Sequence, residues 1–295
     1  LPLEAVVDQV GDARSIVNLP RSSWIGLVSA GFQAARAVGV YDPLLPLEGP
    51  IGHAYDVDFA PDDQSVAVCF HGGHVRRYDA DTGKILTKYE GHAGVPHGVR
   101  KVAFHPGGEL LASVAEDSTL RIWDVESGAQ VNLFKDRADV NSVAWWPGED
   151  RVAFASDVGL SLVDIHTRKG RARDTRPIAE IQIVEDRVYT AWGEAIRVLD
   201  GNLDIIGELP QADVSRLRVA DELLYAASWQ GEDRGVRVWH LPTKTERSFE
   251  ERSEIERQPQ VWGLALDRDR DLIYAGVTPT TGVSSGLICW SSLTQ

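Results

Sequence analysis

The sequence predicts an all-β fold built from repeated four-stranded antiparallel sheets. Short runs rich in β-branched and aromatic residues recur along all 295 residues, separated by turns of Gly, Pro, Asp and Ser. An aromatic or apolar residue followed by a polar one, usually Asp, also recurs at the end of a run every 36 to 50 residues. Several runs, such as residues 66–70, are almost continuously apolar, which is typical of strands covered on both faces. Self-similarity of this period indicates a repeat architecture.

The clearest repeat unit covers residues 91–134. Its four β-like runs are residues 99–104, 110–114, 119–123 and 130–134. The residues between them, such as the His-Pro-Gly-Gly at 105–108, favour tight turns. Four short strands joined by tight turns predict one antiparallel sheet per unit.

The other units keep the landmark at the end of their third run. The seven landmarks are Tyr41-Asp42, Tyr78-Asp79, Trp123-Asp124, Val163-Asp164, Leu199-Asp200, Trp239-His240 and Cys289-Trp290. The corresponding units cover residues 10–48, 49–90, 91–135, 136–173, 174–210, 211–251 and 252–295. Seven landmarks predict seven sheets, and we expect residues 1–295 to form a single domain.

The unit at residues 91–134 resembles a WD-repeat, the blade of the WD-repeat β-propellers, through its Gly-His opening, its Asp117 and its Trp-Asp close. The resemblance extends over essentially the whole chain and is strongest at residues 52–163. It implies a seven-bladed β-propeller of four-stranded antiparallel blades. The chain ends five residues after Trp290, so the last blade needs an outer strand from elsewhere. We expect an N-terminal strand at residues 3–7 to supply it and to cover the exposed edge.

The resemblance also implies a buried polar tetrad. In the unit at residues 91–134 it maps to His92, Ser113, Asp117 and Trp123, with His97 as a rival for the histidine because three extra residues precede the first strand. Ser, His and Asp are also the three residue types of a catalytic triad. A serine on a strand packed between sheets offers no access to substrate and no oxyanion hole, so we predict a structural network and no catalytic residue.

One rim of the propeller is predicted to bind a partner. In this family the loops entering each first strand and the turns between second and third strands open on the same face. The candidate residues in these segments are Tyr55, His71, His74, Arg100, Asn141, Trp192, Trp229, Arg234 and Trp262. Trp, Tyr and Arg dominate binding hot spots, which favours a protein or peptide docking surface. His71 and His74 could chelate a cation, but no further ligand lies nearby in sequence, so no metal site and no cofactor are predicted.

Composition excludes several classes of protein. The net charge of −14 disfavours binding to nucleic acid or to an anionic membrane surface. Residues 24–41 are apolar enough to compete as a membrane span, but their glycines and polar residues favour a buried hairpin. Two cysteines and an acidic N-terminus indicate a cytoplasmic protein. Only six of the 30 basic residues are Lys, a bias typical of a high-GC bacterial genome.

These observations favour a non-catalytic platform that binds proteins or peptides. Most members of the WD-repeat family act in this way, so the resemblance implies that this protein is a scaffold or sensor. We expect it to be a monomeric propeller or a domain within a larger complex. The chain begins without Met, which suggests that it is part of a longer protein. The alternative is an enzymatic propeller, such as a metal-dependent lactonase-like hydrolase, with Glu, Asn and Asp converging on the central axis.

Overall fold

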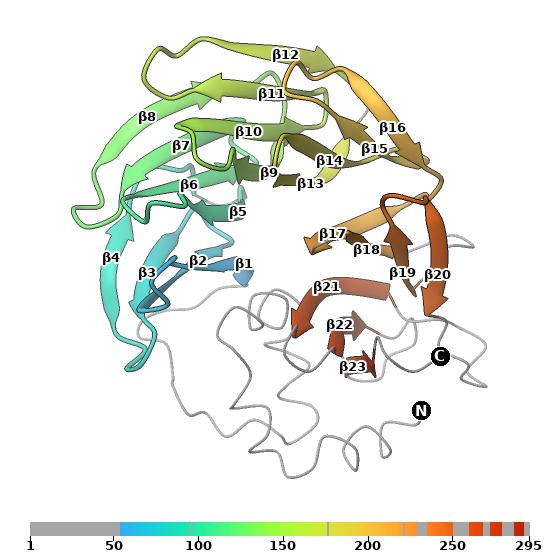
Figure 1. Ribbon diagram of the computed structural model, residues 1–295. Coiled ribbons are helices and arrows are strands. Elements are labelled where there is room, and N and C mark those ends of the chain that lie inside the picture. Colours follow the sequence, from blue (N-terminus) through green and yellow to red (C-terminus); the bar gives the residue numbers. More distant parts are fainter. Residues whose placement is uncertain are drawn as a thin grey trace. The chain divides into compact units, whose positions relative to one another are not determined.

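Every regular element that the structure describes is a β-strand (Figure 1). The computed structural model describes residues 54–94, 96–175, 177–220, 222–228, 235–249, 260–267, 272–278 and 286–291. The chain divides into two compact units, one of residues 45–212 and one of residues 1–44 together with 213–295. Each unit is described by itself.

The unit of residues 45–212 contains four antiparallel sheets of four strands each. Their strands are β1 (Ala54–Phe59), β2 (Ser65–Phe70), β3 (Val75–Asp79), β4 (Ile85–Tyr89), β5 (Val99–Phe104), β6 (Leu110–Ala115), β7 (Thr119–Asp124), β8 (Gln130–Lys135), β9 (Val140–Trp145), β10 (Arg151–Ser156), β11 (Gly159–Asp164), β12 (Gly170–Asp174), β13 (Ile178–Val184), β14 (Arg187–Trp192), β15 (Ala195–Leu199) and β16 (Ile205–Leu209). Within each sheet every strand pairs with the next one along the chain, as expected for short strands joined by tight turns.

The described part of the other unit contains two more antiparallel sheets. One consists of β17 (Val214–Ala220), β18 (Leu223–Ser228), β19 (Gly235–His240) and β20 (Thr245–Phe249). The other consists of β21 (Gln260–Asp267), β22 (Leu272–Thr278) and β23 (Gly286–Ser291). β21 packs against β17 and β18, so these two sheets are neighbours.

Within the unit of residues 45–212 the first strands of successive sheets lie side by side. β5 packs against β1 and β2, β9 against β5 and β6, and β13 against β9 and β10 (Figure 1). Apolar side chains fill the space between the sheets, and Leu111 and Trp123 are fully buried there. Backbone groups also bridge neighbouring sheets, since the Asp58 carboxylate accepts a hydrogen bond from the Phe104 N–H at 2.7 Å.

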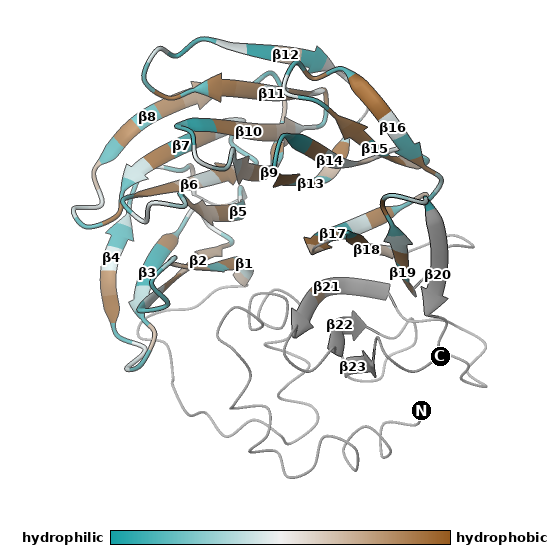
Figure 2. Ribbon diagram, viewed as in Figure 1, coloured by the Kyte–Doolittle hydropathy of each residue, from teal (hydrophilic) through white to brown (hydrophobic). Residues whose placement is uncertain are grey.

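The outermost strand of the third sheet is more polar than the strand beside it. In Figure 2 the edge strand β12 is mostly hydrophilic, whereas its neighbour β11 is mostly hydrophobic. β12 carries Arg171 and Arg173 on the edge of its sheet, where charge protects unpaired backbone groups from pairing with other chains.

The predicted all-β class of four-stranded antiparallel sheets is confirmed. Residues 3–7 and 10–48 lie outside the described residues, so the number of seven blades and the N-terminal closing strand stay predictions. The apolar segment at residues 24–41 also lies outside them. Among the described residues, no helix has the length and apolarity needed to cross a membrane.

Candidate functional site

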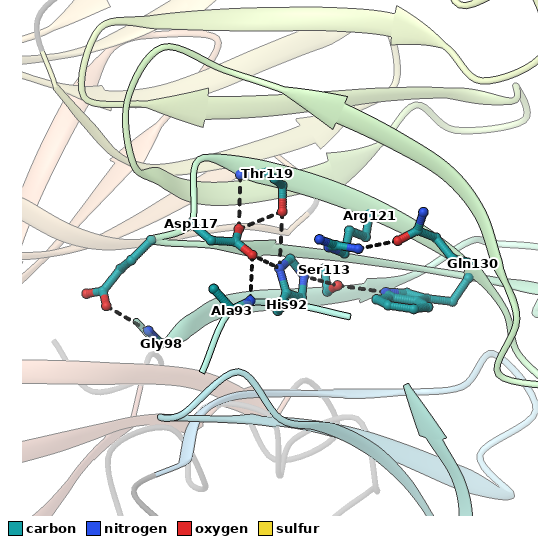
Figure 3. Close-up of polar contacts among 10 residues, drawn as sticks. His92, Ala93, Gly98, Ser113, Asp117, Thr119, Arg121 and Gln130 are labelled. Atoms are coloured by element: carbon teal, nitrogen blue, oxygen red, sulfur yellow. Dashed lines mark hydrogen bonds and ion pairs between the residues drawn. The ribbon is translucent and has the colours of Figure 1, made fainter. Parts of the chain in front are cut away.

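A buried polar network connects β6 and β7, the two middle strands of the second sheet, to the loop before that sheet (Figure 3). The Trp123 indole N–H donates to Ser113 Oγ at 2.8 Å, and Ser113 Oγ lies 2.7 Å from His92 Nε2. His92 Nδ1 lies 3.0 Å from Asp117 Oδ2. Thr119, which sequence reasoning missed, adds its hydroxyl to the other carboxylate oxygen of Asp117 at 2.6 Å. The predicted tetrad residues therefore meet, with Thr119 as a fifth member.

Electrostatics fix how the protons are arranged in this network. Burial lowers the pKa of His92, against the opposing effect of Asp117, and so favours the neutral imidazole. Burial of Asp117 opposes its ionisation, but the hydrogen bonds from His92 and Thr119 outweigh burial and hold its pKa well below the usual range. A neutral His92 donates from Nδ1 to the Asp117 carboxylate and accepts the Ser113 hydroxyl proton at Nε2, which assigns the tautomer from the network.

The geometry gives the Ser-His-Asp set a structural role. Ser113 is fully buried and its hydroxyl is already shared between Trp123 and His92. His97, the rival for the histidine position, lies outside the network, where its carbonyl accepts from the Gly72 N–H at 3.0 Å. We therefore assign His92 to the tetrad.

The network also holds the loop that leads to the rim. Asp117 Oδ2 accepts from the Ala93 N–H at 2.9 Å, which ties residues 92–93 to the turn between β6 and β7. The turn between β2 and β3 packs onto the same loop through Gly73, whose φ is +83° and whose place no side chain can take, because an added Cβ would lie 2.4 Å from the Ala93 carbonyl oxygen. Turns of two neighbouring sheets thus form one fixed edge.

Tyr55, His71 and Arg100 meet at this edge. The Arg100 guanidinium lies 5.4 Å from the centroid of the Tyr55 ring, and the Tyr55 and His71 rings are 6.2 Å apart. Glu116 forms an ion pair with Arg100 and accepts from the Gly98 N–H at 2.7 Å. We call Tyr55, His71, Arg100 and Glu116 the rim cluster. The Arg100 side chain stays 41% exposed, so the cluster presents a supported cation beside an aromatic ring.

Among the remaining rim candidates, the structure describes the side chains of His74 and Asn141. His74 is exposed in the turn between β2 and β3. The Asn141 side chain on β9 donates at 2.8 Å to Oδ1 of Asp157, which lies in the turn between β10 and β11 of the same sheet. Trp192 ends β14 and Trp262 lies in β21, but their side chains, like all of Trp229 and Arg234, lie outside the described part. A rim that includes these indoles stays a prediction.

A buried ion pair connects the first strands of the second and fourth sheets, and a serine on the first strand of the third sheet lies beside it. Lys101 on β5 forms an ion pair with Glu180 on β13, and its ammonium group also lies 3.3 Å from Ser142 Oγ on β9. Ser142 Oγ in turn accepts from the Ile181 N–H at 3.0 Å. Glu180 is 2% exposed, so its charge is compensated inside the protein. Sequence reasoning missed this contact because the two charges lie 79 residues apart.

Comparison with known proteins identifies one repeat directly. The family model described as "WD domain, G-beta repeat" matches residues 83–124. These residues include β7 and the tetrad members His92, Ser113, Asp117 and Trp123. The resemblance predicted from this part of the chain is therefore confirmed.

Curated relatives match over parts of the chain. The serine-threonine kinase receptor-associated protein of Gallus gallus is 48% identical over 59 residues, which cover 20% of this chain and 16% of the relative. The nuclear distribution protein PAC1 of Ajellomyces capsulatus is 30% identical over 162 residues, 54% of this chain and 32% of the relative. The ribosome biogenesis protein ERB1 of Coccidioides immitis is 40% identical over 78 residues, 26% of this chain and 9% of the relative.

These matches span less than a third of each relative. All three relatives are eukaryotic, so they give no support to the bacterial source expected from the arginine bias. Among solved structures, that of U3-55K superposes with a TM-score of 0.68 at 17% identity and covers 78% of this chain and 76% of that chain. At this identity the likeness concerns the fold alone.

Proposed function

Because the chain belongs to the WD-repeat family, we propose that it is a non-catalytic platform that binds a protein or peptide partner at the rim cluster. The observation that carries the proposal is the exposed Arg100 guanidinium held over the Tyr55 ring. The names of the relatives are in line with this function, since one is a receptor-associated protein and another a ribosome biogenesis protein. Their partners are not transferred to this chain.

The rim cluster has the properties of a binding hot spot. Arg and Tyr bury a large area on binding and keep a polar tip for hydrogen bonds. The Glu116 carboxylate holds Arg100 in place before any partner arrives, which reduces the side-chain entropy lost on binding. The fixed turns beneath the cluster, which the tetrad anchors through Ala93, add to this preorganisation.

The inner strands do not favour the enzymatic alternative. A metal-dependent propeller hydrolase needs carboxylates that are free to ligate an ion near the central axis. In the described sheets of residues 45–212, Glu180 is paired with Lys101 and Asn141 is bonded to Asp157. This arrangement supports an inner surface that stabilises neighbouring sheets, without a reaction centre.

Quantitative affinity purification tests the proposal. The full chain, Arg100→Ala, Tyr55→Ala and a matched control, Arg171→Ala on the exposed edge strand β12, are used as baits in extracts of the source organism. We expect a defined set of proteins that wild type and Arg171→Ala retain and that both rim variants lose at least tenfold. Circular dichroism must give the same melting temperature for all four proteins. Retention of the same proteins by both rim variants would reject the proposed site.

The proposal extends to the cellular compartment and the form of the protein. We propose a cytoplasmic protein that acts as a monomeric propeller or as a domain within a larger complex. The Cys69 side chain is buried as a thiol, which supports a reducing compartment. The net charge of −14 supports a partner other than nucleic acid. Cell fractionation and size-exclusion chromatography test these two statements.

A further inference from the structure

A hollow of about 390 Å³ lies against the second sheet, beside the tetrad. It is lined by Arg121 on β7, by Leu133 and Lys135 on β8, and by residues 117–119 where β7 begins. Its size lies within the range of about 300 to 1,000 Å³ that ligand sites usually have. We call it the arginine hollow, after the half-buried Arg121 in its wall.

The Arg121 guanidinium is held in place but has no carboxylate partner among the described residues. Its Nη1 donates to the amide oxygen of Gln130 (Figure 3). The guanidinium packs against Gly91, where an added Cβ would lie 2.8 Å from Nη1. Within the described part of the chain Arg121 Nε is buried and makes no hydrogen bond, and Arg121 forms no ion pair. A buried charged donor is costly to leave without an acceptor.

Arg197 on β15 occupies the equivalent position of the fourth sheet, since each arginine lies two residues before the landmark of its unit. Strand pairing places Glu208 of the outer strand opposite Arg197, whereas it places Leu133 opposite Arg121. Arg197 Nε donates to Glu208 Oε1 at 2.7 Å. The same nitrogen therefore has a carboxylate acceptor in the fourth sheet and an apolar neighbour in the second.

The charges around the arginine hollow favour a carboxylate over a phosphate. Arg121 and the exposed Lys135 supply two positive charges. Asp117 and Asp136 also line the hollow, but Asp117 accepts from the Ala93 N–H at 2.9 Å and Asp136 accepts from the backbone N–H of the next residue. These two carboxylates repel a doubly charged phosphate more strongly than a singly charged carboxylate.

We propose that the arginine hollow binds the carboxylate of an Asp or Glu side chain from the protein partner. The inference rests on the proposed function, because the turn between β6 and β7 carries Glu116 of the rim cluster together with Asp117 and Ser118 of the hollow. A peptide that contacts the rim cluster can reach the hollow across this single turn. A guanidinium binds carboxylates through charge-assisted hydrogen bonds, and one already held by Gln130 loses little freedom on binding.

NMR titration of the whole chain with a capped Gly-Glu-Glu-Gly peptide tests the proposal. We expect a saturable shift of the Arg121 Nε–H signal and no such shift with a capped Gly-Gln-Gln-Gly peptide. Arg121→Gln should weaken binding at least tenfold, as followed by the backbone amide signals of Thr119 and Lys135. Arg197→Gln is the matched control and should bind the peptide as wild type does, because Arg197 already has its carboxylate in Glu208.

Leu133→Glu gives the arginine hollow a carboxylate of its own. Strand pairing places this side chain opposite Arg121, as Glu208 lies opposite Arg197. The new carboxylate should pair with Arg121 and weaken peptide binding at least tenfold, with no loss in melting temperature. Leu133→Gln has the same shape without the charge and should bind the peptide as wild type does.

The proposal is wrong if wild type shows no saturable shift with the glutamate peptide. It is equally wrong if Arg121→Gln or Leu133→Glu binds this peptide as tightly as wild type, because the peptide then binds elsewhere. A response of Arg121 to inorganic phosphate without a response to the peptide would overturn the choice of a carboxylate. The peptide is detected at Arg121 itself, so a failure of the rim cluster in affinity purification would leave these results unchanged.

Discussion

Two neighbouring sheets, β5–β8 and β9–β12, have the same strand order and the same pairing between their two middle strands, but polar groups occupy core positions in one sheet that apolar side chains occupy in the other. In the sheet β5–β8, Ser113 on β6 and Trp123 on β7 belong to a polar network that also contains His92. Cross-strand pairing places Phe154 and Val163 at the equivalent positions of the sheet β9–β12. Two apolar side chains therefore fill the place of the indole and the hydroxyl. The same sheet geometry tolerates either solution, so the tetrad is not required to form a four-stranded sheet.

The fourth sheet shows what a hydroxyl does without its partners. Thr190 on β14 is equivalent to Ser113, and Leu199 on β15 is equivalent to Trp123. With no indole donor opposite, the Thr190 hydroxyl donates to the Arg197 carbonyl at 3.3 Å on the adjacent strand. Among the sheets of residues 45–212 that the structure describes, only β5–β8 combines all the groups. The network thus ties a loop to its sheet, a role that apolar residues cannot take.

The largest effect should come from removing the indole. Trp123→Ala empties a fully buried site and leaves the Ser113 hydroxyl without its donor, so we expect a loss of about 3 to 5 kcal/mol in the free energy of unfolding. Urea denaturation followed by circular dichroism measures it. The comparison is Val163→Ala at the equivalent position of β9–β12, where a smaller loss is expected. Equal losses in the two sheets would contradict the special role of the network.

A smaller effect should follow from removing only the central hydroxyl. Ser113→Ala keeps the packing but leaves the Trp123 N–H and the His92 Nε2 without their partner, at an expected cost of about 1 to 3 kcal/mol. Thr190→Val in the fourth sheet removes a hydroxyl that serves one long hydrogen bond, so its cost should be lower. Urea denaturation of both variants sharpens the comparison. A cost for Thr190→Val that matches Ser113→Ala would mean that any buried hydroxyl matters equally.

Local patterns in the sequence were sufficient to predict the described sheets, whereas the tetrad was implied by the resemblance to the WD-repeat family. Turn residues and apolar runs lie next to one another along the chain, so strand limits such as Val99–Phe104 follow from short-range rules. The choice between His92 and His97 stayed open at that level because it depends on how the loop at residues 92–98 folds. The structure resolves it through a bend in which the His97 N–H donates to the Gly94 carbonyl at 3.1 Å.

Long-range contacts could not be predicted in this way. Arg100 reaches Tyr55 on the preceding sheet, and Lys101 reaches Glu180 two sheets further along. No spacing rule connects such residues, because their proximity depends on how successive sheets stack. The contact of His105 Nε2 with Asp150 Oδ1 at 3.3 Å could not be predicted for the same reason, whereas His71 and His74 lie close enough in sequence to be considered as cation ligands, although no metal site was predicted there.

The smallest expected effect is on how the free energy of unfolding depends on pH, and it is also the effect most specific to the network. Burial holds the pKa of His92 below its ordinary value of 6.5, so on acidification below about pH 6.5 the unfolded chain takes up a proton that the folded chain does not. The free energy of unfolding should therefore fall as the pH is lowered from 7 towards 5. Asp117 acts in the same direction but only in stronger acid, because its carboxylate is protonated near pH 3.8 when the chain is unfolded and at still lower pH when it is folded.

His92→Gln removes this titration and should reduce the slope of stability against pH between 7 and 5, even though the variant is less stable throughout. His74→Gln is the matched control, since it replaces an exposed imidazole that lies outside the network and leaves Asp117 bonded. Urea denaturation at half-unit intervals of pH gives both slopes. If His92→Gln keeps the slope of the wild type, the acid sensitivity arises outside the tetrad and the neutral state assigned to His92 is wrong. If the slope falls in this variant alone, the sheet β5–β8 carries a proton-linked stability that the apolar core of β9–β12 does not have.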